Sequence, residues 1–366
     1  MMSEYRVYEL AEVCSRLSSG KGIPASKVTP EGNYPVYGGN GLRGYTEQSN
    51  FSGDCAIIGR QGAFCGNVRY FSGEAYMTEH AVVVCATPEH NTRYLAYLLS
   101  TMNLGRLSGQ SAQPGLSVKT LGKQQISLPT LDTQNRVASI LARLDEKIEL
   151  NNHINENLQQ QAAALYGKYF PYATTDELPV GWRVGTVGDI VEIHDSKRIP
   201  LSGAQRAKME KRIYPYYGAA SLMDYVDEYI FDGKYLLLGE DGTVVDEYGY
   251  PILQYVWGKF WVNNHAHILT GKLGFNVESL WLLFKRTPVK SIVTGAVQPK
   301  ISQANLRSVQ VVIPPQNELD MFNELIRPMF GQIRQHQEQN NTLTAMRDAL
   351  LPKLMSGEVD ISAIQI

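Results

Sequence analysis

The sequence predicts an α+β protein in which two similar, β-rich α/β domains are separated by a long antiparallel two-helix coiled coil. Three observations support this fold class. A repeat relates the two halves of the chain, each half begins with short β-branched and aromatic runs, and each half ends in a long heptad pattern. We call the two domains head 1 and head 2. The expected limits are 1–131 for head 1, 132–170 for the first helix, 171–180 for a linker, 181–313 for head 2, 314–356 for the second helix and 357–366 for a C-terminal tail.

The repeat consists of short matches that occur in the same order in both halves. Chance similarity between aromatic-rich segments would not preserve that order, so the matches indicate tandem duplication of one unit. The matched pairs are Tyr34–Gly38 with Tyr214–Gly218, His80-Ala81 with His265-Ala266, Gln113-Pro114 with Gln298-Pro299, and Pro129 with Pro314.

Each head is expected to contain short buried strands and one helix. Runs of β-branched residues bounded by Gly and Asn clusters predict strands joined by turns. Leucines that recur at helical spacing, Leu95, Leu98 and Leu99, predict the helix of head 1. The expected elements are strands over 54–59 and 79–85 and a helix over 91–101 in head 1, and strands over 234–239 and 265–269 and a helix over 277–284 in head 2.

The heptad pattern runs from Val137 to Tyr169 in the first long helix and from Phe322 to Leu354 in the second. Both patterns become polar at the same two central layers. Buried polar side chains cost stability but fix the register of a coiled coil, because they must pair across the helices. The residues expected to set this register are Asn151, Asn155, His336 and Asn340.

Composition excludes several classes of protein. The chain has 366 residues, 43% of them hydrophobic and 19% charged, and a formal net charge of −2. It has no apolar run long enough for a membrane span, and its start does not resemble a signal peptide. Its four cysteines all lie between Cys14 and Cys85, which does not suit a disulfide framework. We therefore expect a reduced, cytoplasmic protein with no membrane association.

The sequence contains only weak signals for an enzymatic or metal site. Gly39–Gly44 matches the dinucleotide fingerprint G-x-G-x-x-G, but no strand–helix context surrounds it, so a turn is the better interpretation. His265 and His267 could share a strand face as metal ligands, yet no third ligand is evident and structural histidines are favoured. Cys55 and Cys65 lack zinc-type spacing and are expected to be buried thiols. No metal site and no catalytic residue are therefore predicted.

The chain resembles the specificity (S) subunits of type I restriction-modification systems over essentially its full length. The resemblance rests on two variable domains, each followed by a helical region, and on three ordered motifs. These are Gln113–Ser117 with Leu128-Pro129, Gln298–Ser302 with Ile313–Pro315, and the C-terminal segment Leu350–Val359. In this resemblance the heads are target recognition domains, each reading one half of a bipartite double-stranded DNA target.

The resemblance also implies partners. Two methyltransferase (M) subunits dock on the helices, which set the spacing between half-sites, and restriction (R) subunits can join. S-adenosylmethionine and ATP with Mg²⁺ would belong to those partners, and this chain would bind no cofactor. The alternative from another class is a bivalent, non-enzymatic scaffold with two ligand-binding heads.

Basic and amide residues in Gly-rich loops are the candidates for DNA contact, because they reach both phosphates and base edges. Each head carries a slight excess of basic over acidic residues, so binding is expected to depend on both heads together. The candidates are Lys21, Arg43, Arg60, Gln61, Arg69 and Lys119 in head 1, and Lys197, Arg198, Arg206, Lys211, Arg212 and Lys300 in head 2.

Overall fold

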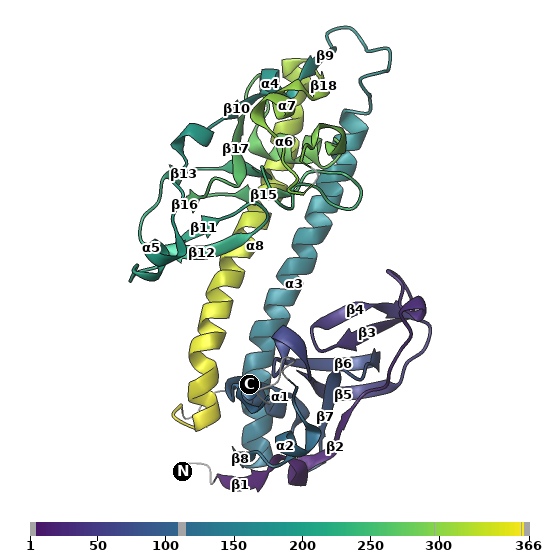
Figure 1. Cartoon of the computed structure of the whole chain (residues 1–366), viewed down its shortest axis with the longest axis vertical. Helices are drawn as coiled ribbons and strands as arrows, with labels where there is room; N and C mark the ends of the chain where they lie inside the picture. Colours follow the sequence, from purple (N-terminus) through teal and green to yellow (C-terminus); the bar gives the residue numbers. More distant parts are fainter. Residues whose placement is uncertain (1–4, 109–114, 296, 360, 362–366) are drawn as a thin grey trace. The chain divides into compact units, whose positions relative to one another are not determined.

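The computed structural model describes residues 5–108, 115–295, 297–359 and 361 (Figure 1). The chain forms two compact units: unit 1 comprises residues 1–151 and 338–366, and unit 2 comprises residues 152–337. The long helices α3 (Leu131–Tyr169) and α8 (Gln316–Ser356) each contribute one part to each unit. Each head is therefore packed on a pair of helix segments within its own unit.

Head 1 is built on a six-stranded sheet with the strand order β2-β7-β5-β6-β3-β4. Strands β3 and β6 pair in parallel, and the other neighbours are antiparallel. A second, two-stranded sheet joins β1 and β8 beside the start of α3 (Figure 1). The elements are β1 (Arg6–Glu9), η1 (Leu10–Val13), β2 (Cys14–Ser19), η2 (Ala25–Lys27), β3 (Tyr34–Gly38), β4 (Gly41–Thr46), β5 (Phe51–Gly59), η3 (Gly62–Phe64), β6 (Val68–Met77), β7 (Ala81–Ala86), α1 (Thr92–Thr101), η4 (Leu104–Leu107), α2 (Val118–Gly122) and β8 (Gln125–Leu128).

Head 2 repeats this topology, but two of its strands are divided. The strand that corresponds to β5 is divided into β13 and β14, and the strand that corresponds to β6 is divided into β15 and β16. Gly233 (φ 134°) and Gly258 (φ 77°), which lie at the two breaks, have backbone conformations that an L-residue rarely adopts. Head 2 therefore has two four-stranded sheets, β10-β17-β14-β15 and β12-β11-β16-β13, and the pair β18-β9. The elements are β9 (Arg183–Thr186), α4 (Val187–Ile190), β10 (Val191–Ile193), η5 (Asp195–Lys197), α5 (Gly203–Ala207), β11 (Tyr214–Tyr217), β12 (Leu222–Val226), β13 (Phe231–Asp232), β14 (Tyr235–Gly239), β15 (Leu253–Val256), β16 (Lys259–Val262), β17 (Ala266–Gly271), α6 (Val277–Phe284), η6 (Lys290–Ile292), α7 (Gln303–Ser308) and β18 (Gln310–Ile313).

The expected strands and helices are confirmed, with small differences at their ends. The repeated segments Tyr34–Gly38 and Tyr214–Gly218 form equivalent strands, β3 and β11. The turn expected at Gly39–Gly44 is shorter than predicted: Gly39 and Asn40 form the turn of the β3–β4 hairpin, and Gly41–Gly44 belong to β4. Gln113-Pro114 lies outside the described residues. None of the helices in the described part of the chain is long and apolar enough to cross a membrane.

Each head shares its apolar core with its helix pair. In unit 1, Val84 and Leu95 of head 1 belong to one buried cluster with Leu141 of α3 and Leu354 of α8. In unit 2, the corresponding cluster joins strand and helix residues of head 2 to Tyr166 of α3 and to Phe322 and Ile326 of α8. Burying one such side chain stabilises the fold by about 1.5–3 kcal/mol. Head and helices thus form one core within each unit.

The two helices run antiparallel in each unit, and their central polar side chains meet. In unit 1, Asn151 Nδ2 donates to Asn340 Oδ1 at 2.8 Å, and Asp145 and Arg347 pair further along. In unit 2, His336 Nδ1 lies 2.9 Å from Asn155 Oδ1. These are the four residues expected to set the register, and that role remains a prediction.

Candidate nucleic-acid interface

Loops from distant parts of head 1 meet at one end of its main sheet. The N–H of Arg60, after β5, donates to the carbonyl of His80 at 2.9 Å, and the N–H of Leu116 donates to the carbonyl of Arg60 at 2.8 Å. The N–H of Thr78 donates to the carbonyl of Tyr37 at 2.9 Å, which attaches the turn after β3. We call this meeting of loops the strand-end surface of head 1, comprising residues 37–43, 59–61, 78–80 and 115–117.

Glycines allow these loops to approach one another closely. A Cβ on Gly59 would lie 2.2 Å from the carbonyl oxygen of Phe64 and 2.6 Å from that of Gly39. Neither backbone atom can give way, so only glycine fits at the end of β5. At Gly41 (φ 100°), a Cβ would lie 2.9 Å from the guanidinium of Arg69. The glycines of the apparent dinucleotide motif therefore serve close packing of the hairpin.

Most of the candidate residues of head 1 gather here. Gln61 Oε1 lies 3.1 Å from His80 Nδ1, and Arg69 Nη2 donates to the carbonyl of Asn40 at 3.4 Å. Arg43 is exposed on β4, and the Arg60 side chain is half-buried. The N–H of Lys21 donates to the carbonyl of Met77 at 2.9 Å, which places Lys21 beside the same loops. Lys119 is exposed on α2. This surface combines cations with an amide and an imidazole.

Head 2 has the same backbone frame at its strand ends. The N–H of Glu240 donates to the carbonyl of His265 at 2.8 Å, and the N–H of Ile301 donates to the carbonyl of Glu240 at 2.8 Å. The N–H of Asn263 donates to the carbonyl of Tyr217 at 3.0 Å. The strand-end surface of head 2 therefore comprises residues 217–223, 239–241, 263–265 and 300–302.

The side chains in this frame are different from those of head 1. Asp241 Oδ1 lies 2.6 Å from His265 Nδ1, so a carboxylate replaces the amide of Gln61. Glu240 stands where head 1 has Arg60, and it pairs with Arg198 and, at 3.2 Å, with Lys300. The surface therefore carries acceptors that internal cations partly neutralise.

A buried charged network lies directly beneath the strand-end surface of head 2. Asp195 receives the N–H of Ile268 at 3.0 Å and the amide of Gln303 at 2.6 Å, and His267 Nδ1 lies 2.6 Å from its Oδ2. Burial alone would raise the pKa of Asp195, but His267, Ile268 and Arg198 outweigh it and hold this pKa below its usual value. The pKa of Glu240 is also lowered. Burial opposes the ionisation of this carboxyl group, but Arg198 and His267 favour it more strongly.

The ligand atoms of Asp195, Glu240 and His267 lie within 4.8 Å of one another, a spacing that a metal ion could bridge. The sequence suggested His267 but missed both carboxylates. However, His267 Nε2 lies 2.8 Å from the carbonyl of Ile301, which can only accept a hydrogen bond. Gln303 and Arg198 direct hydrogens at the carboxylate oxygens. This donor set fits an ion-pair network and agrees with the preference for structural histidines.

The other basic candidates of head 2 divide into internal and exposed residues. Only 13% of the Arg198 side chain is exposed, and it donates to the carbonyl of Ala266 at 2.8 Å. Arg206 donates to Asp224 at 3.0 Å and lies over the Tyr216 ring. Arg212 also pairs with Asp224 but is half exposed. Lys197 and Lys211 are exposed. Contact of these residues with DNA remains a prediction.

The cysteines agree in part with the expectation of buried thiols. Cys55 is fully buried, and burial raises its pKa to about 12. Cys65 is only half-buried and donates to the carbonyl of Arg60. All four cysteines are free.

The comparison with known families decides the assignment. The sequence model described as "Type I restriction modification DNA specificity domain" matches residues 2–160 and 179–344. The chain belongs to this family. Because the model of the specificity domain matches twice, the tandem duplication expected from the sequence is confirmed.

Individual relatives agree with this membership. A segment of 123 residues, 34% of this chain and 30% of the relative, is 43% identical to the EcoprrI type I restriction enzyme specificity subunit of Escherichia coli. The MjaIX specificity subunit of Methanocaldococcus jannaschii is 26% identical over 306 residues, 75% of this chain and 70% of the relative. The crystal structure of a type I restriction-modification S subunit from M. genitalium has the same fold, with a TM-score of 0.62 and 17% identity over 96% of each chain.

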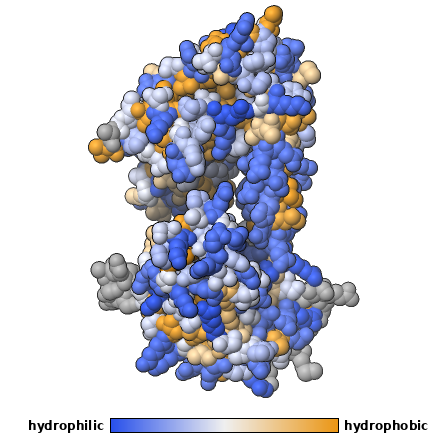
Figure 2. Space-filling view, turned by 90° about the vertical axis from the view of Figure 1, so that its right-hand side faces the viewer, coloured by the Kyte–Doolittle hydropathy of each residue, from blue (hydrophilic) through white to orange (hydrophobic). Residues whose placement is uncertain are grey.

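The surface suits polar recognition. On the face that Figure 2 presents, hydrophobic residues occur singly or in small groups among hydrophilic ones. Scattered apolar residues are ordinary on a protein surface.

Proposed function

We propose that this chain is the DNA sequence-specificity subunit of a type I restriction-modification complex, and that each head reads one half of a bipartite double-stranded target. The observation that carries the proposal is the double match to the specificity domain family. The matching backbone frames of the two strand-end surfaces support it, because they present different side chains from the same loops.

The side chains of these surfaces have the chemistry that base reading requires. Arginine pairs with guanine and an amide with adenine in the major groove, whereas a carboxylate accepts from the cytosine amino group. Head 1 offers Arg43, Arg69 and Gln61, and head 2 offers Asp241 with Lys300 beside it. Lys21, Lys197 and Lys211 would contact phosphates, which position the heads without reading sequence.

The chain would act without catalysis of its own. Methyltransferase subunits would dock on α3 and α8 and supply S-adenosylmethionine chemistry, and restriction subunits would supply ATP-dependent cleavage with Mg²⁺. The helix pair would set the distance between half-sites. Inserting four residues after Asn155 lengthens α3 by about 6 Å and rotates the following residues by about 40°. The preferred gap should then grow by a base pair or two, or binding should be lost, while the half-site sequences stay unchanged.

Selection of bound duplexes from a randomised pool tests the proposal. The complex with its methyltransferase subunits is compared in three forms: unchanged, Gln61→Ala and Asp241→Ala. Each substitution should relax discrimination at one base position by about 1–3 kcal/mol, and only in the half-site of its own head. The unchanged complex should also lose affinity steeply as salt rises. Salt-insensitive binding without sequence preference would instead indicate the bivalent scaffold.

A further inference from the structure

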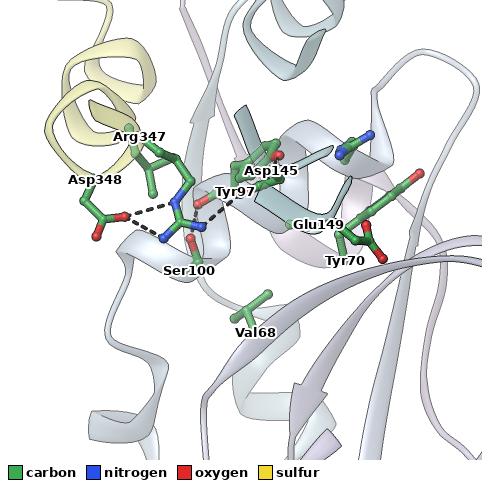
Figure 3. A pocket seen from close by; sticks show the side chains of 11 residues that line it. Val68, Tyr70, Tyr97, Ser100, Asp145, Glu149, Arg347 and Asp348 are labelled. Atoms are coloured by element: carbon green, nitrogen blue, oxygen red, sulfur yellow. Dashed lines mark hydrogen bonds and ion pairs between the residues drawn. The ribbon is translucent and has the colours of Figure 1, made fainter. Parts of the chain in front are cut away.

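Charged side chains around a pocket of about 450 Å³ in unit 1 bond to one another (Figure 3). Arg347 donates to Asp145 at 2.9 Å and to Asp348 at 2.8 Å. The Tyr97 hydroxyl donates to Asp145 at 2.5 Å. These contacts join α1 of head 1 to α3 and α8, so internal pairing accounts for this cluster. A polar atom that is held in place and lacks a partner is more informative, and the strand-end surface of head 2 has one.

His265, in the strand-end surface of head 2, is fixed through its backbone and through one ring nitrogen. Its N–H donates to Asn263 Oδ1 at 2.8 Å, and its carbonyl accepts the N–H of Glu240 at 2.8 Å. In the ring, Nδ1 lies 2.6 Å from Asp241 Oδ1. The other ring nitrogen, Nε2, has no hydrogen bond within the described part of the chain, and 44% of the side chain is exposed. The ring is thus positioned, with one nitrogen left for an external partner.

The contact with Asp241 determines which ring nitrogen carries the hydrogen. A carboxylate oxygen only accepts, so Nδ1 donates to it, and Nε2 of the neutral imidazole carries a lone pair. Among the described residues, Asp241 Oδ2 likewise has no hydrogen bond. The preceding residue, Glu240, is already paired with Arg198 and Lys300. His265 Nε2 and Asp241 Oδ2 are therefore two neighbouring acceptors without a donor.

His80 occupies the equivalent position in head 1, but both of its ring nitrogens have a polar neighbour. Nδ1 lies 3.1 Å from Gln61 Oε1, and Nε2 lies 3.3 Å from Glu79 Oε1. Head 2 has Asn264 in place of Glu79. The exposed fraction of the side chain is 44% for both histidines. The two rings therefore differ in whether Nε2 is already engaged, and only that of His265 is open to an external donor.

We propose that His265 is a specificity-determining residue of head 2, and that its Nε2 accepts a hydrogen bond from the exocyclic amino group of a base. This inference rests on the proposed function. In the major groove each base pair presents one such group, N6 of adenine or N4 of cytosine. An acceptor that is fixed before binding loses little freedom on binding, and it disfavours a base that presents another acceptor. His265 thus reads which strand carries the amino group at one base pair.

Base analogues that lack the amino group test this contact. In duplexes with the selected half-site of head 2, each adenine on either strand is replaced in turn by purine and each cytosine by 2-pyrimidinone. Affinities are measured for the complex with its methyltransferase subunits, unchanged and with His265→Asn. The asparagine amide can still donate to Asp241 but places no atom at the position of Nε2. We expect one amino group whose removal weakens the unchanged complex about tenfold more than the His265→Asn complex.

A second variant separates the acceptor from the packing of the ring. His265→Gln gives up the contact with Asp241, but its amide oxygen reaches the position of Nε2 and accepts. It should retain most of the dependence on that amino group. Urea unfolding verifies that head 2 stays folded in both variants. Loss of the dependence in His265→Gln as complete as in His265→Asn would show that the ring acts through its packing, and would contradict the assignment of Nε2 as the reading atom.

His80→Asn is the matched control in head 1. Because both ring nitrogens of His80 have neighbours within its own head, this change should alter the amino-group dependence of the other half-site by less than about twofold. Equal effects of His80→Asn and His265→Asn would overturn the inference, because the unbonded Nε2 would not matter. A His265→Asn complex that keeps every preference of a sequence-specific parent would also overturn it. An unchanged complex with no sequence preference would instead contradict the proposed function itself.

Discussion

The strand ends of the two heads have one backbone frame and opposite side-chain chemistry. The hydrogen bond to the histidine carbonyl measures 2.9 Å from Arg60 and 2.8 Å from Glu240. The next residue contacts the histidine ring through an amide in head 1 and a carboxylate in head 2. The loops are thus positioned by backbone hydrogen bonds, which the side chains at positions 60 and 240 do not form. Side chains at these positions can therefore differ between family members without a change in the fold of the head, as expected for domains that recognise different DNA sequences.

Head 2 also differs from head 1 in having charged side chains buried beneath its strand-end surface, and burying charge lowers stability unless the charges are paired. Ser19, the last residue of β2, corresponds to Asp195, which lies just after β10, and Val82 corresponds to His267. At these two positions head 1 therefore has a small neutral side chain and an apolar one, where head 2 has the hydrogen-bonded pair of Asp195 and His267. Buried charges must be paired and hydrogen-bonded to be tolerated. The stability of head 2 should depend on its charged network, whereas that of head 1 should not.

Removing Asp195 should produce the largest effect. Asp195→Ala leaves His267, Gln303 and Arg198 without their shared acceptor and should lower the free energy of unfolding of unit 2 by about 3–5 kcal/mol. Urea unfolding followed by tryptophan fluorescence measures this, because all four tryptophans lie in unit 2. The matched change Ser19→Ala should alter the stability of head 1, measured by hydrogen exchange, by less than about 0.5 kcal/mol. Equal losses in both units would contradict the comparison.

The junctions of the heads with their helices show a second contrast, an inversion of charge. In unit 2, Glu278 of α6 accepts from Lys234, from Tyr255 at 2.8 Å and from Arg334 at 3.2 Å. In unit 1, Arg93 of α1 corresponds to Glu278, Asp54 of β5 corresponds to Lys234, and Glu149 of α3 corresponds to Arg334. These three residues lie around Tyr70, the counterpart of Tyr255. Every charge has the opposite sign. Each head is thus complementary to the helix pair of its own unit.

Reversing one charge at each junction sharpens this contrast. Glu278→Arg brings a third cation beside Lys234 and Arg334 and should destabilise unit 2 by about 3 kcal/mol, because the Glu278 side chain is only 4% exposed. Arg93→Glu should cost unit 1 about 1–2 kcal/mol, since the Arg93 side chain is 23% exposed. Urea unfolding and hydrogen exchange measure the two losses.

A triple variant is the control for this interpretation. Glu278→Arg combined with Lys234→Asp and Arg334→Glu gives unit 2 the charge pattern of unit 1. It should regain more than half of the stability that Glu278→Arg loses. If the three changes were simply additive, the inverted charges would not act as a complementary set.

The sequence was informative where local pattern determines structure. Leucines at helical spacing located α1, and the heptad pattern located α3 and α8 with their polar layers. It could not predict the charged network of head 2, because Asp195, Glu240 and His267 are distant in the chain. Only the strand order β10-β17-β14 brings them together. Arg198 was expected as a DNA contact because it is a basic residue in a loop, whereas in the structure its side chain is 13% exposed and bonded to internal acceptors.

Acidification should affect unit 2 before unit 1. The pKa values of Asp195, Glu240 and Glu278 are lowered in the folded state, where cations and hydrogen-bond donors outweigh burial. A carboxyl group whose pKa is lower in the folded than in the unfolded state stabilises the fold at pH values above its unfolded-state pKa. This stabilisation is lost as the pH falls through its folded-state pKa. The urea concentration at the midpoint of the tryptophan fluorescence transition should therefore decrease when the pH is lowered below about 4. Asp195→Ala should show a weaker pH dependence. An unchanged midpoint between pH 7 and pH 3 would contradict this.

The polar layers of the helix pair should give the smallest effect on stability. In unit 1, Asn151 and Asn340 are buried and bonded to each other at 2.8 Å, whereas in unit 2 His336 is only half-buried beside Asn155. Asn340→Leu removes an acceptor from a buried amide and should cost about 1–2 kcal/mol. Asn151→Leu/Asn340→Leu removes both partners and should regain most of this loss, since a fully apolar layer needs no pairing. His336→Leu should cost less than Asn340→Leu, because Asn155 keeps the hydrogen bond that its Nδ2 donates to the carbonyl of Ile333 at 3.3 Å.

The double variant also separates stability from register. A leucine layer accepts neighbouring registers, whereas a buried amide pair accepts one. If α3 and α8 set the spacing of the half-sites, Asn151→Leu/Asn340→Leu should bind targets with a wider range of gaps at near-normal stability. The half-site sequences should stay unchanged, because both strand-end surfaces are intact. Duplexes that differ only in gap length, competed for one complex, measure this range. A double variant with the parental gap preference would show that the apolar layers alone fix the register, and that the asparagines contribute only stability.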